Sequence, residues 1–361
     1  MHVPDGFINA PVSAVTGVIA AGAIAVSLRG ARRELDERTA PLAGLVAAFI
    51  FSVQMLNFPV AAGTSGHLLG GALAAILVGP YTGVLCVSVV LLMQGILFAD
   101  GGLTALGVNI TDMAIVTTVV AYAVFRGLVK VLPRRRSSVT AASFVAALLS
   151  VPCAALAFTA MYALGGTTDV PVGKVLTAMV GVHVLIGIGE AAITALTVGA
   201  VIAVRPDLVY GARGLTAPLK LRVGGELIDA PAAEPVPAAA RSARSARSTR
   251  STRSTRRIWG IGLITALVLA GFVSFYASAS PDGLEKVAHD KGIDAKEQPH
   301  RTGDSPLAGY GVKDISDARL SGGLAGLIGV GATVVVGSGV FWAVRRRRTQ
   351  AAPAGPNAEA V

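Results

Sequence analysis

The N-terminal Met-His pair is the part of this sequence best suited to bind a metal ion. A free α-amine on Met1, the backbone nitrogen of His2 once it is deprotonated, and the His2 imidazole offer three nitrogen donors in fused chelate rings. A second imidazole would complete four nitrogens near a square plane. Such a set suits Ni²⁺ or Cu²⁺ and accepts Co²⁺, whereas Mg²⁺ and Ca²⁺ prefer oxygen ligands. Because these donors bind as deprotonated groups, capture should weaken in acid.

The fourth donor must come from another of the five histidines. His67 is expected at the mouth of a short apolar segment, on the same outer surface as His2, where the two imidazoles can share one site. A histidine at a membrane interface is more often a hydrogen-bonded packing residue, so spacing alone leaves both interpretations open. His289 and His300 fall in a polar loop, where they could meet incoming metal or simply be solvated.

His183 and Glu190 lie about two helical turns apart within one apolar run. Ionisable groups inside a membrane usually face the bundle interior and pair, so we expect these two to form a pair. A structural hydrogen bond between helices is the favoured interpretation, and a path for metal or protons is the other.

The elements that position these residues are membrane helices. The chain has 361 residues, 53% of them hydrophobic and 14% charged, against about 25% charged residues in soluble domains. A bilayer core of about 30 Å needs about 20 helical residues. We therefore predict an all-α polytopic membrane protein with nine apolar segments, of which the third is too short to cross and is expected to be a half-helix. The segments are 11–28, 42–58, 67–78, 83–98, 108–131, 141–164, 175–204, 258–278 and 320–344.

The basic residues set the expected orientation. The net charge is +10, but Lys and Arg gather in short segments between apolar runs with no interleaved aromatic residues, which argues against nucleic-acid binding. An outside N-terminus puts every basic cluster on the cytoplasmic side, as the positive-inside rule requires. The clusters are 29–38, 130–136, 241–257 and 345–348. We expect a multi-pass protein of the bacterial cell (plasma) membrane with a cytoplasmic C-terminus.

The chain end that carries the Met1 amine is expected to stay free. Residues 1–7 contain an acid and no base, unlike a signal peptide. His2 is too bulky a second residue for the usual removal of the initiator methionine. Cys86 and Cys153 lie inside apolar runs and are expected to be packing residues rather than a disulfide framework.

The motifs of common catalytic sites are missing from the sequence. Gly173-Lys174 lacks the earlier glycine and the following Ser or Thr of a Walker A motif. Neither a His-Glu-x-x-His helix nor a Gly-x-Ser-x-Gly elbow occurs. We therefore expect a protein that is not an enzyme and that depends on other subunits for any ATP hydrolysis.

Residues 1–205 resemble the CbiM/NikM family, the substrate-binding membrane components of energy-coupling factor (ECF) transporters for cobalt and nickel. The motifs that carry the resemblance are MHVPDGF (1–7), NFPV (57–60), GTSGHL (63–68), DGGLTALGVN (100–109) and HVLIGIGEA (183–191). Residues 258–345 are similar to the PDGLE (CbiN/NikN-like) accessory component through SPDGLE (280–285), two helices flanking an external loop.

The resemblance implies a seven-helix S-component bundle followed by a two-helix module. A Pro/Ala-rich and then Arg/Ser-rich linker, 206–257, would join them as a disordered cytoplasmic segment, and 346–361 would form a cytoplasmic tail. The Arg/Ser repeat belongs to neither family pattern.

The resemblance also implies a metal site and partners. Met1, His2 and His67 would be the metal ligands, and Ser65 and Asn109 would orient those ligands or close the loop, or else only form hydrogen bonds within it. The substrate would be Co²⁺, or Ni²⁺ as a second choice, with no permanently bound cofactor. The partners would be a transmembrane coupling (T, CbiQ-like) subunit, cytoplasmic ATPase (A, CbiO-like) subunits and membrane lipid.

Two other classes of protein stay open on the residues alone. Asp112, His183 and Glu190 could form a proton-coupled route in a secondary divalent metal transporter that works without ATPases. A membrane scaffold would bind no metal. The family resemblance argues against both.

Overall fold

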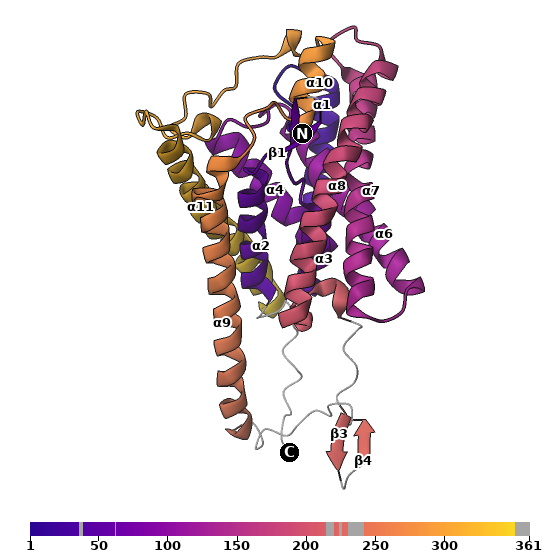
Figure 1. Cartoon of the computed structure of the whole chain (residues 1–361), viewed down its shortest axis with the longest axis vertical. Coiled ribbons are helices and arrows are strands. Elements are labelled where there is room, and N and C mark those ends of the chain that lie inside the picture. The colour runs from indigo at the N-terminus through magenta and orange to yellow at the C-terminus, as the bar shows by residue number, and fades with distance from the viewer. Residues whose placement is uncertain (36–38, 62, 214–219, 224–225, 230–241, 351–361) are drawn as a thin grey trace, which may run out of the picture.

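The computed structural model describes residues 1–35, 39–61, 63–213, 220–223, 226–229 and 242–350 (Figure 1). Most of these residues form helices that run side by side along the long axis of the molecule. The principal helices are α1 (Ala10–Glu34), α2 (Thr39–Gln54), α3 (Gly71–Val78), α4 (Pro80–Leu97), α5 (Leu106–Asn109), α6 (Thr117–Val131), α7 (Arg136–Gly165), α8 (Val172–Val204), α9 (Ser242–Gly271), α10 (Gly283–Lys291) and α11 (Ala318–Gln350). A π-helical segment, Ile110–Val116, joins α5 to α6.

The predicted all-α membrane fold is confirmed. Seven of the described helices are long and apolar enough to cross a membrane. Each of the nine predicted apolar segments lies largely within a helix, although α2 has only 16 residues and α3 only eight. All residues of α3 are buried, as expected for a half-helix enclosed by protein.

Two carboxylates satisfy the buried helix starts around α3. Glu190 of α8 accepts hydrogen bonds from the amides of Leu69 (2.7 Å) and Gly70 (3.1 Å), just before α3 begins. Glu34 of α1 accepts from Thr82 in the first turn of α4, through its amide (2.7 Å) and its hydroxyl (2.8 Å). The first amides of a helix have no partner within the helix and carry partial positive charge, so a buried half-helix needs such acceptors.

A short hairpin carries the chain from α2 to His67. Strands β1 (Phe58–Ala61) and β2 (Thr64–Gly66) are antiparallel, with Phe58 opposite Gly66 and Pro59 opposite Ser65. His67 follows β2 directly, so the hairpin holds it at the end of the bundle that also contains Met1 (Figure 1).

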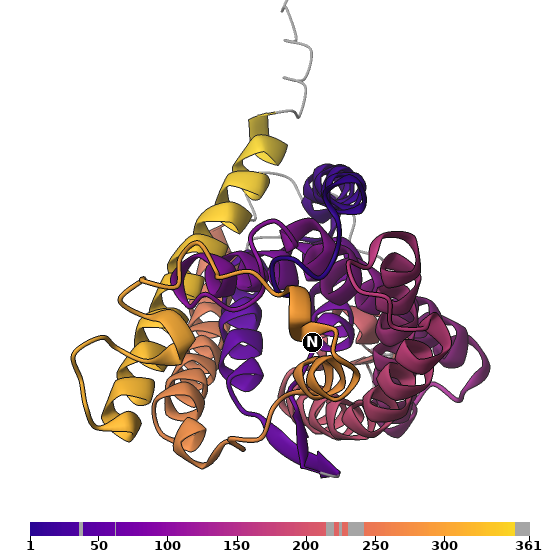
Figure 2. The same cartoon turned by 90° about the horizontal axis from the view of Figure 1, so that it is seen from above.

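The two C-terminal spanning helices pack beside α2. Contacts link α2 with both α9 and α11. Glycines permit this approach: a Cβ on Gly44 of α2 would lie 2.4 Å from Ser338 Oγ of α11, and one on Gly329 of α11 would lie 2.2 Å from Phe51 Cζ of α2. Seen from above, the connection between α9 and α11 crosses the end of the bundle and passes over the chain N-terminus (Figure 2).

The linker differs from the prediction where the structure describes it. The Arg/Ser repeat, expected to be disordered, forms the first part of α9, which begins at Ser242. Ala and Arg favour the helix and no Pro or Gly interrupts this stretch, so the spanning helix can propagate backward through it. Strands β3 (Lys220–Val223) and β4 (Glu226–Asp229) form a second hairpin within the linker. The Pro/Ala-rich stretch 230–241 and the end of the tail, 351–361, lie outside the described residues.

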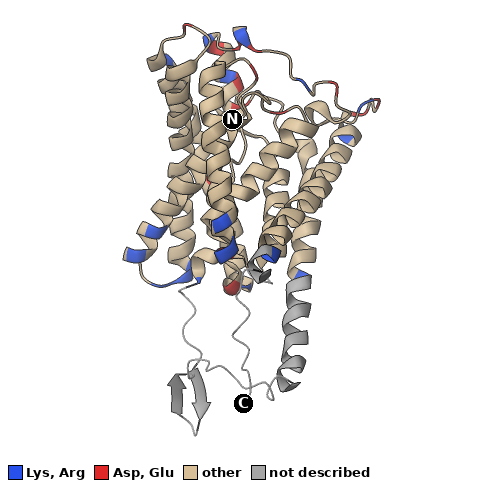
Figure 3. Cartoon of the chain, turned by 180° about the vertical axis from the view of Figure 1, so that it is seen from behind, with Lys and Arg blue, Asp and Glu red and all other residues tan. Residues whose placement is uncertain are grey.

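Charged side chains divide between the two ends of the bundle (Figure 3). At the end away from the N-terminus the coloured residues are mainly Lys and Arg, whereas acidic and basic residues are mixed at the end that contains Met1. This is the distribution that the positive-inside rule describes.

Candidate metal site

The N-terminal segment is folded into the bundle rather than lying on it. Met1 is 3% exposed and Val3 is fully buried. The backbone of Val3 is held by Asn109, whose Oδ1 accepts from the Val3 amide (2.7 Å) and whose Nδ2 donates to the Val3 carbonyl (3.1 Å). Gly102 N also donates to that carbonyl (2.9 Å). Asn109 therefore orients the segment that carries the two N-terminal donors.

Further contacts fix the next residues of the segment. Asp5 accepts from the amides of Leu103 (3.3 Å) and Thr104 (2.7 Å). The carbonyl of Phe7 accepts from the amide of Thr167 (3.2 Å). The position of Met1 is thus set by the loops that follow α4 and α7 as well as by Asn109.

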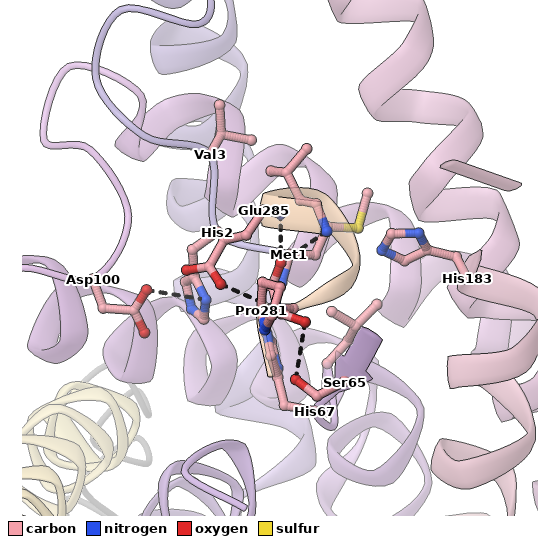
Figure 4. Close-up of polar contacts among 12 residues, drawn as sticks. Met1, His2, Val3, Ser65, His67, Asp100, His183, Pro281 and Glu285 are labelled. Atoms are coloured by element: carbon pink, nitrogen blue, oxygen red, sulfur yellow. Dashed lines mark hydrogen bonds and ion pairs between the residues drawn. The ribbon is translucent and has the colours of Figure 1, made fainter. Parts of the chain in front are cut away.

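The Met1 amino group meets His67 (Figure 4) and the Asp282 carboxylate. Its nitrogen lies 2.6 Å from His67 Nε2 and 2.7 Å from Asp282 Oδ2. His67 Nδ1 is 3.0 Å from the carbonyl oxygen of Leu68. A carbonyl oxygen only accepts, so Nδ1 carries the proton and the lone pair of Nε2 faces the amine. Histidines that bind metals have this arrangement, with the second nitrogen donating to a backbone carbonyl.

The His2 ring lies against the His67 ring, with centroids 5.1 Å apart and an interplanar angle of 27°. Its Nε2 is 3.0 Å from Gln94 Oε1, and its Nδ1 is 3.3 Å from Asp100 Oδ1. Both ring nitrogens therefore face acceptor oxygens, and when Nδ1, the nitrogen that a Met-His chelate uses, binds a metal ion, the proton on Nε2 is donated to Gln94. Burial lowers the pKa of His2 to about 4, against the opposing effect of Asp100. The imidazole is therefore neutral at physiological pH and able to bind a metal.

Asp282 joins the site from the loop that precedes α10. Its Oδ1 accepts from the amides of Leu284 and Glu285, both at 2.8 Å, and so caps α10. The Glu285 carboxylate accepts in turn from the Asp282 amide (2.9 Å), which completes a capping box. Burial alone would raise the pKa of Asp282, but the Met1 ammonium holds it well below its ordinary value. Ligand atoms of His2, His67 and Asp282 all lie within 4.8 Å of one another.

Three other predicted residues either contact the second module or belong to it. Ser65 Oγ donates to the Ser280 carbonyl (2.7 Å) and the Ser65 amide donates to the Pro281 carbonyl (2.8 Å), so Ser65 holds the loop that carries Asp282. His300 Nε2 lies 3.1 Å from the Gly101 carbonyl, and the exposed His289 lies 3.1 Å from Asp294 Oδ2. Neither of these loop histidines belongs to the cluster around Met1.

His183 and Glu190 do not pair with each other as expected, although Glu190 does form structural hydrogen bonds to another helix, the favoured interpretation. His183 Nδ1 bonds to the Met179 carbonyl of its own helix (2.7 Å), while Glu190 accepts from the amides before α3. Two helical turns separate the two side chains by about 10 Å along α8, too far for a hydrogen bond. The Glu190 carboxylate instead accepts from the amides at the start of the half-helix, which have no partner within that helix.

Two cavities flank the cluster and share His2, Asp100, Asp282 and Glu285 in their linings. One has a volume of 510 Å³ and extends toward α2, the segment that follows α9, and α11. The other has a volume of 410 Å³ and lies between the N-terminal segment and the loop around α10. The nitrogen donors thus lie between two polar, partly acidic spaces, which favour a cation.

Comparison with known proteins gives the family. Residues 2–208 match the family model of CbiM, the cobalt uptake substrate-specific transmembrane region. Residues 256–346 match the PDGLE domain. The chain therefore belongs to the CbiM family, with a PDGLE domain fused behind it, and both resemblances found in the sequence are confirmed.

The relatives are transport proteins. A putative metal transport protein of Haloquadratum walsbyi is 39% identical over 210 residues, which cover 58% of this chain and 94% of the relative. A putative fused nickel transport protein, NikMN, of Archaeoglobus fulgidus is 39% identical over 211 residues, which cover 58% of this chain and 68% of the relative. The crystal structure of a truncated transition metal transporter matches at 27% identity with a TM-score of 0.50, over 56% of this chain and 99% of that one. The chain is thus a multi-pass membrane protein of a cobalt and nickel transport family.

Proposed function

We propose that this chain is the substrate-specific membrane component of an ECF transporter and that it captures Co²⁺ or Ni²⁺ at the extracellular face. The observation that carries the proposal is the 2.6 Å contact between the Met1 amine and His67 Nε2 beside the stacked His2 ring. Two atoms that bind one metal ion as neighbours lie at about this separation, because each metal–nitrogen bond is about 2.0 Å long.

Capture would proceed by exchange of protons for the metal ion. The amine and the His2 backbone nitrogen each give up a proton to the solvent, and these two nitrogens then bind with the imidazoles of His2 and His67. The His2 imidazole is already neutral, and His67 directs its Nε2 at the amine in the arrangement described above. Asn109 holds the chelating segment in place, so little order has to be gained when the ion arrives.

Release toward the cytoplasm would need partners. A transmembrane coupling subunit and cytoplasmic ATPases would supply the movement and the hydrolysis, because the sequence has no Walker A motif. The expected orientation, with the N-terminus outside, agrees with the mainly basic opposite end of the bundle. Cobalt for corrinoid synthesis is the first choice of substrate and nickel the second, because the nitrogen ligands alone hardly separate the two metals.

Metal binding to the purified full-length chain tests the proposal. Isothermal titration with Co²⁺ and with Ni²⁺ should give one site on the parent and a large loss of affinity in His2→Ala and in His67→Ala. His289→Ala is the matched control, since this exposed histidine lies outside the cluster. Equal affinity in all four proteins would reject the proposed site.

One observation supports a second candidate, a proton-coupled secondary transporter. Asp112 in the π-helical segment is fully buried, and among the described residues neither of its carboxylate oxygens has a hydrogen-bond partner. A buried carboxyl group of this kind is typical of proton relays in transporters. Metal uptake that a protonophore abolishes and that persists without any ATPase would favour this alternative.

A further inference from the structure

We propose that Asp282 of the PDGLE domain is itself a ligand of the transported ion, so that the two modules build one metal site together. The inference rests on the proposed function and extends it from a set of nitrogen donors to a set that includes one carboxylate oxygen. The fused second module would then contribute directly to the affinity and the geometry of the site.

The geometry permits one ion to contact Asp282, the Met1 nitrogen and His67 without any movement. Met1 N, His67 Nε2 and Asp282 Oδ2 are separated by 2.6, 2.7 and 3.5 Å. A circle through these three atoms has a radius of about 1.8 Å, which is shorter than a metal–ligand bond of about 2.0–2.1 Å. A point at bonding distance from all three therefore exists, about 1 Å outside their plane.

The orientation of the Asp282 carboxylate leaves one oxygen for the ion. Oδ1 is occupied by the two amides at the start of α10, so only Oδ2 is directed at the amine. Of the two other acids beside the site, Asp100 places Oδ1 3.3 Å from His2 Nδ1, but it lies outside the group of His2, His67 and Asp282 whose ligand atoms converge. Asp100 Oδ2 accepts from the Tyr310 hydroxyl (2.5 Å), and Glu285 accepts from the backbone of Asp282. The structure thus prepares Asp282 for binding through a single oxygen.

Close packing holds Asp282 in this position. A Cβ on the next residue, Gly283, would lie 2.8 Å from both Ile186 Cδ1 and Val182 Cγ1 of α8. The start of α10 therefore rests directly on α8, while Ser65 fixes the two residues before Asp282 from the other side. A ligand on a loop anchored in this way is restrained nearly as well as one on a helix.

Charge balance gives the same result. The ammonium and the carboxylate together are neutral in the metal-free state. When a divalent ion enters, one proton leaves the amine and one leaves the His2 backbone nitrogen, so the ion faces one amidate and the Asp282 carboxylate. The sum of these charges is again zero. Without Asp282, the remaining positive charge would be balanced only by acids outside the ligand cluster, such as the more exposed Asp100 beside the His2 ring, which is less favourable in a low-dielectric environment.

Spectroscopy separates this role from a merely structural one. Four nitrogens alone would give Ni²⁺ a square-planar environment, whereas an added carboxylate oxygen gives five-coordination. X-ray absorption at the nickel edge of the parent should therefore lack the pre-edge peak of square-planar nickel. This measurement needs no variant and stands even if a substitution disturbs folding.

The substitution that tests the inference is Asp282→Asn in the full chain, with Asp290→Asn as the matched control. Asn can still cap α10 but loses the charge, and Asp290 lies within α10, where it pairs with the exposed Lys286 and not with the metal cluster. We expect Asp282→Asn to weaken Ni²⁺ binding by about 10- to 100-fold and to change the visible absorption bands of the bound nickel. Asp290→Asn should leave both unchanged.

The outcomes distinguish the two proposals. A parent with a square-planar nickel edge, or an Asp282→Asn variant with the parent's absorption bands, overturns the role of Asp282 as a ligand while the N-terminal nitrogen site stands. A parent that binds neither Co²⁺ nor Ni²⁺ overturns the proposed function itself.

Discussion

Asn109 should control metal affinity without touching the metal. Asn109→Ala removes the acceptor of the Val3 amide, whereas the Val3 carbonyl keeps its bond from Gly102 at 2.9 Å. Val3 is fully buried, so its N–H group would be left without a partner. Such a group costs about 1–3 kcal/mol. The cost falls on the metal-bound form, which requires the segment to be docked, whereas the free segment can leave the bundle and expose the amide to water.

The expected loss follows from this energy. Since about 1.4 kcal/mol corresponds to a factor of ten, Ni²⁺ affinity should fall by about 5- to 150-fold. Isothermal titration of the purified chain measures it. Asn9→Ala is the matched control, because Asn9 only caps α1 by accepting from the Val12 amide at 3.1 Å. An Asn109→Ala variant that binds Ni²⁺ as tightly as Asn9→Ala would refute the reasoning.

Three further predictions concern stability and docking. Because burial lowers the pKa of His2 from 6.5 to about 4, the unfolded chain binds more protons between these values. The metal-free protein should therefore lose stability as the pH falls through this range. The Tm of His2→Gln should decrease less than the Tm of the parent over the same range, and equal decreases would contradict this prediction. Glu190→Gln should cost about 1 kcal/mol at the buried start of α3, and an unchanged Tm would show that the carboxylate is dispensable there. Ser65→Ala should loosen the loop around Asp282, so limited trypsin digestion at Lys291 should be faster than in the parent, and an equal rate would argue against this anchor.

The fold could be predicted from the sequence because each membrane helix has a local signal. Each needs a long apolar run, and the short third run correctly predicted the half-helix α3. The start of α9 was missed because the Arg/Ser repeat has no apolar face, so nothing in its composition indicated a helix. The propensity of Ala and Arg to continue an existing helix was the competing effect.

The candidate site could be predicted only in part. The chemistry of a free amine followed by histidine indicated Met1 and His2, and the expected topology brought His67 to the same end of the bundle. The structure places these three together, and their role as metal ligands stays a prediction. Asp282 was missed as a member of this cluster because 281 residues separate it from Met1, and it was visible only as part of the PDGLE motif. The contact between Gln94 and His2 was missed because a glutamine inside an apolar run does not indicate which residue it will bind.

The most direct test of the account is to insert two glutamines between Met1 and His2. The insertion keeps the amine and both histidines in the chain, and Gln is as bulky a second residue as His. Three backbone nitrogens would then separate the amine from the imidazole, so one square plane could not hold both ends of the chelate. Co²⁺ and Ni²⁺ titrations should show a loss of affinity at least as large as that in His67→Ala. Affinity equal to that of the parent chain would contradict the claim that the Met1 amine and His2 bind the metal together.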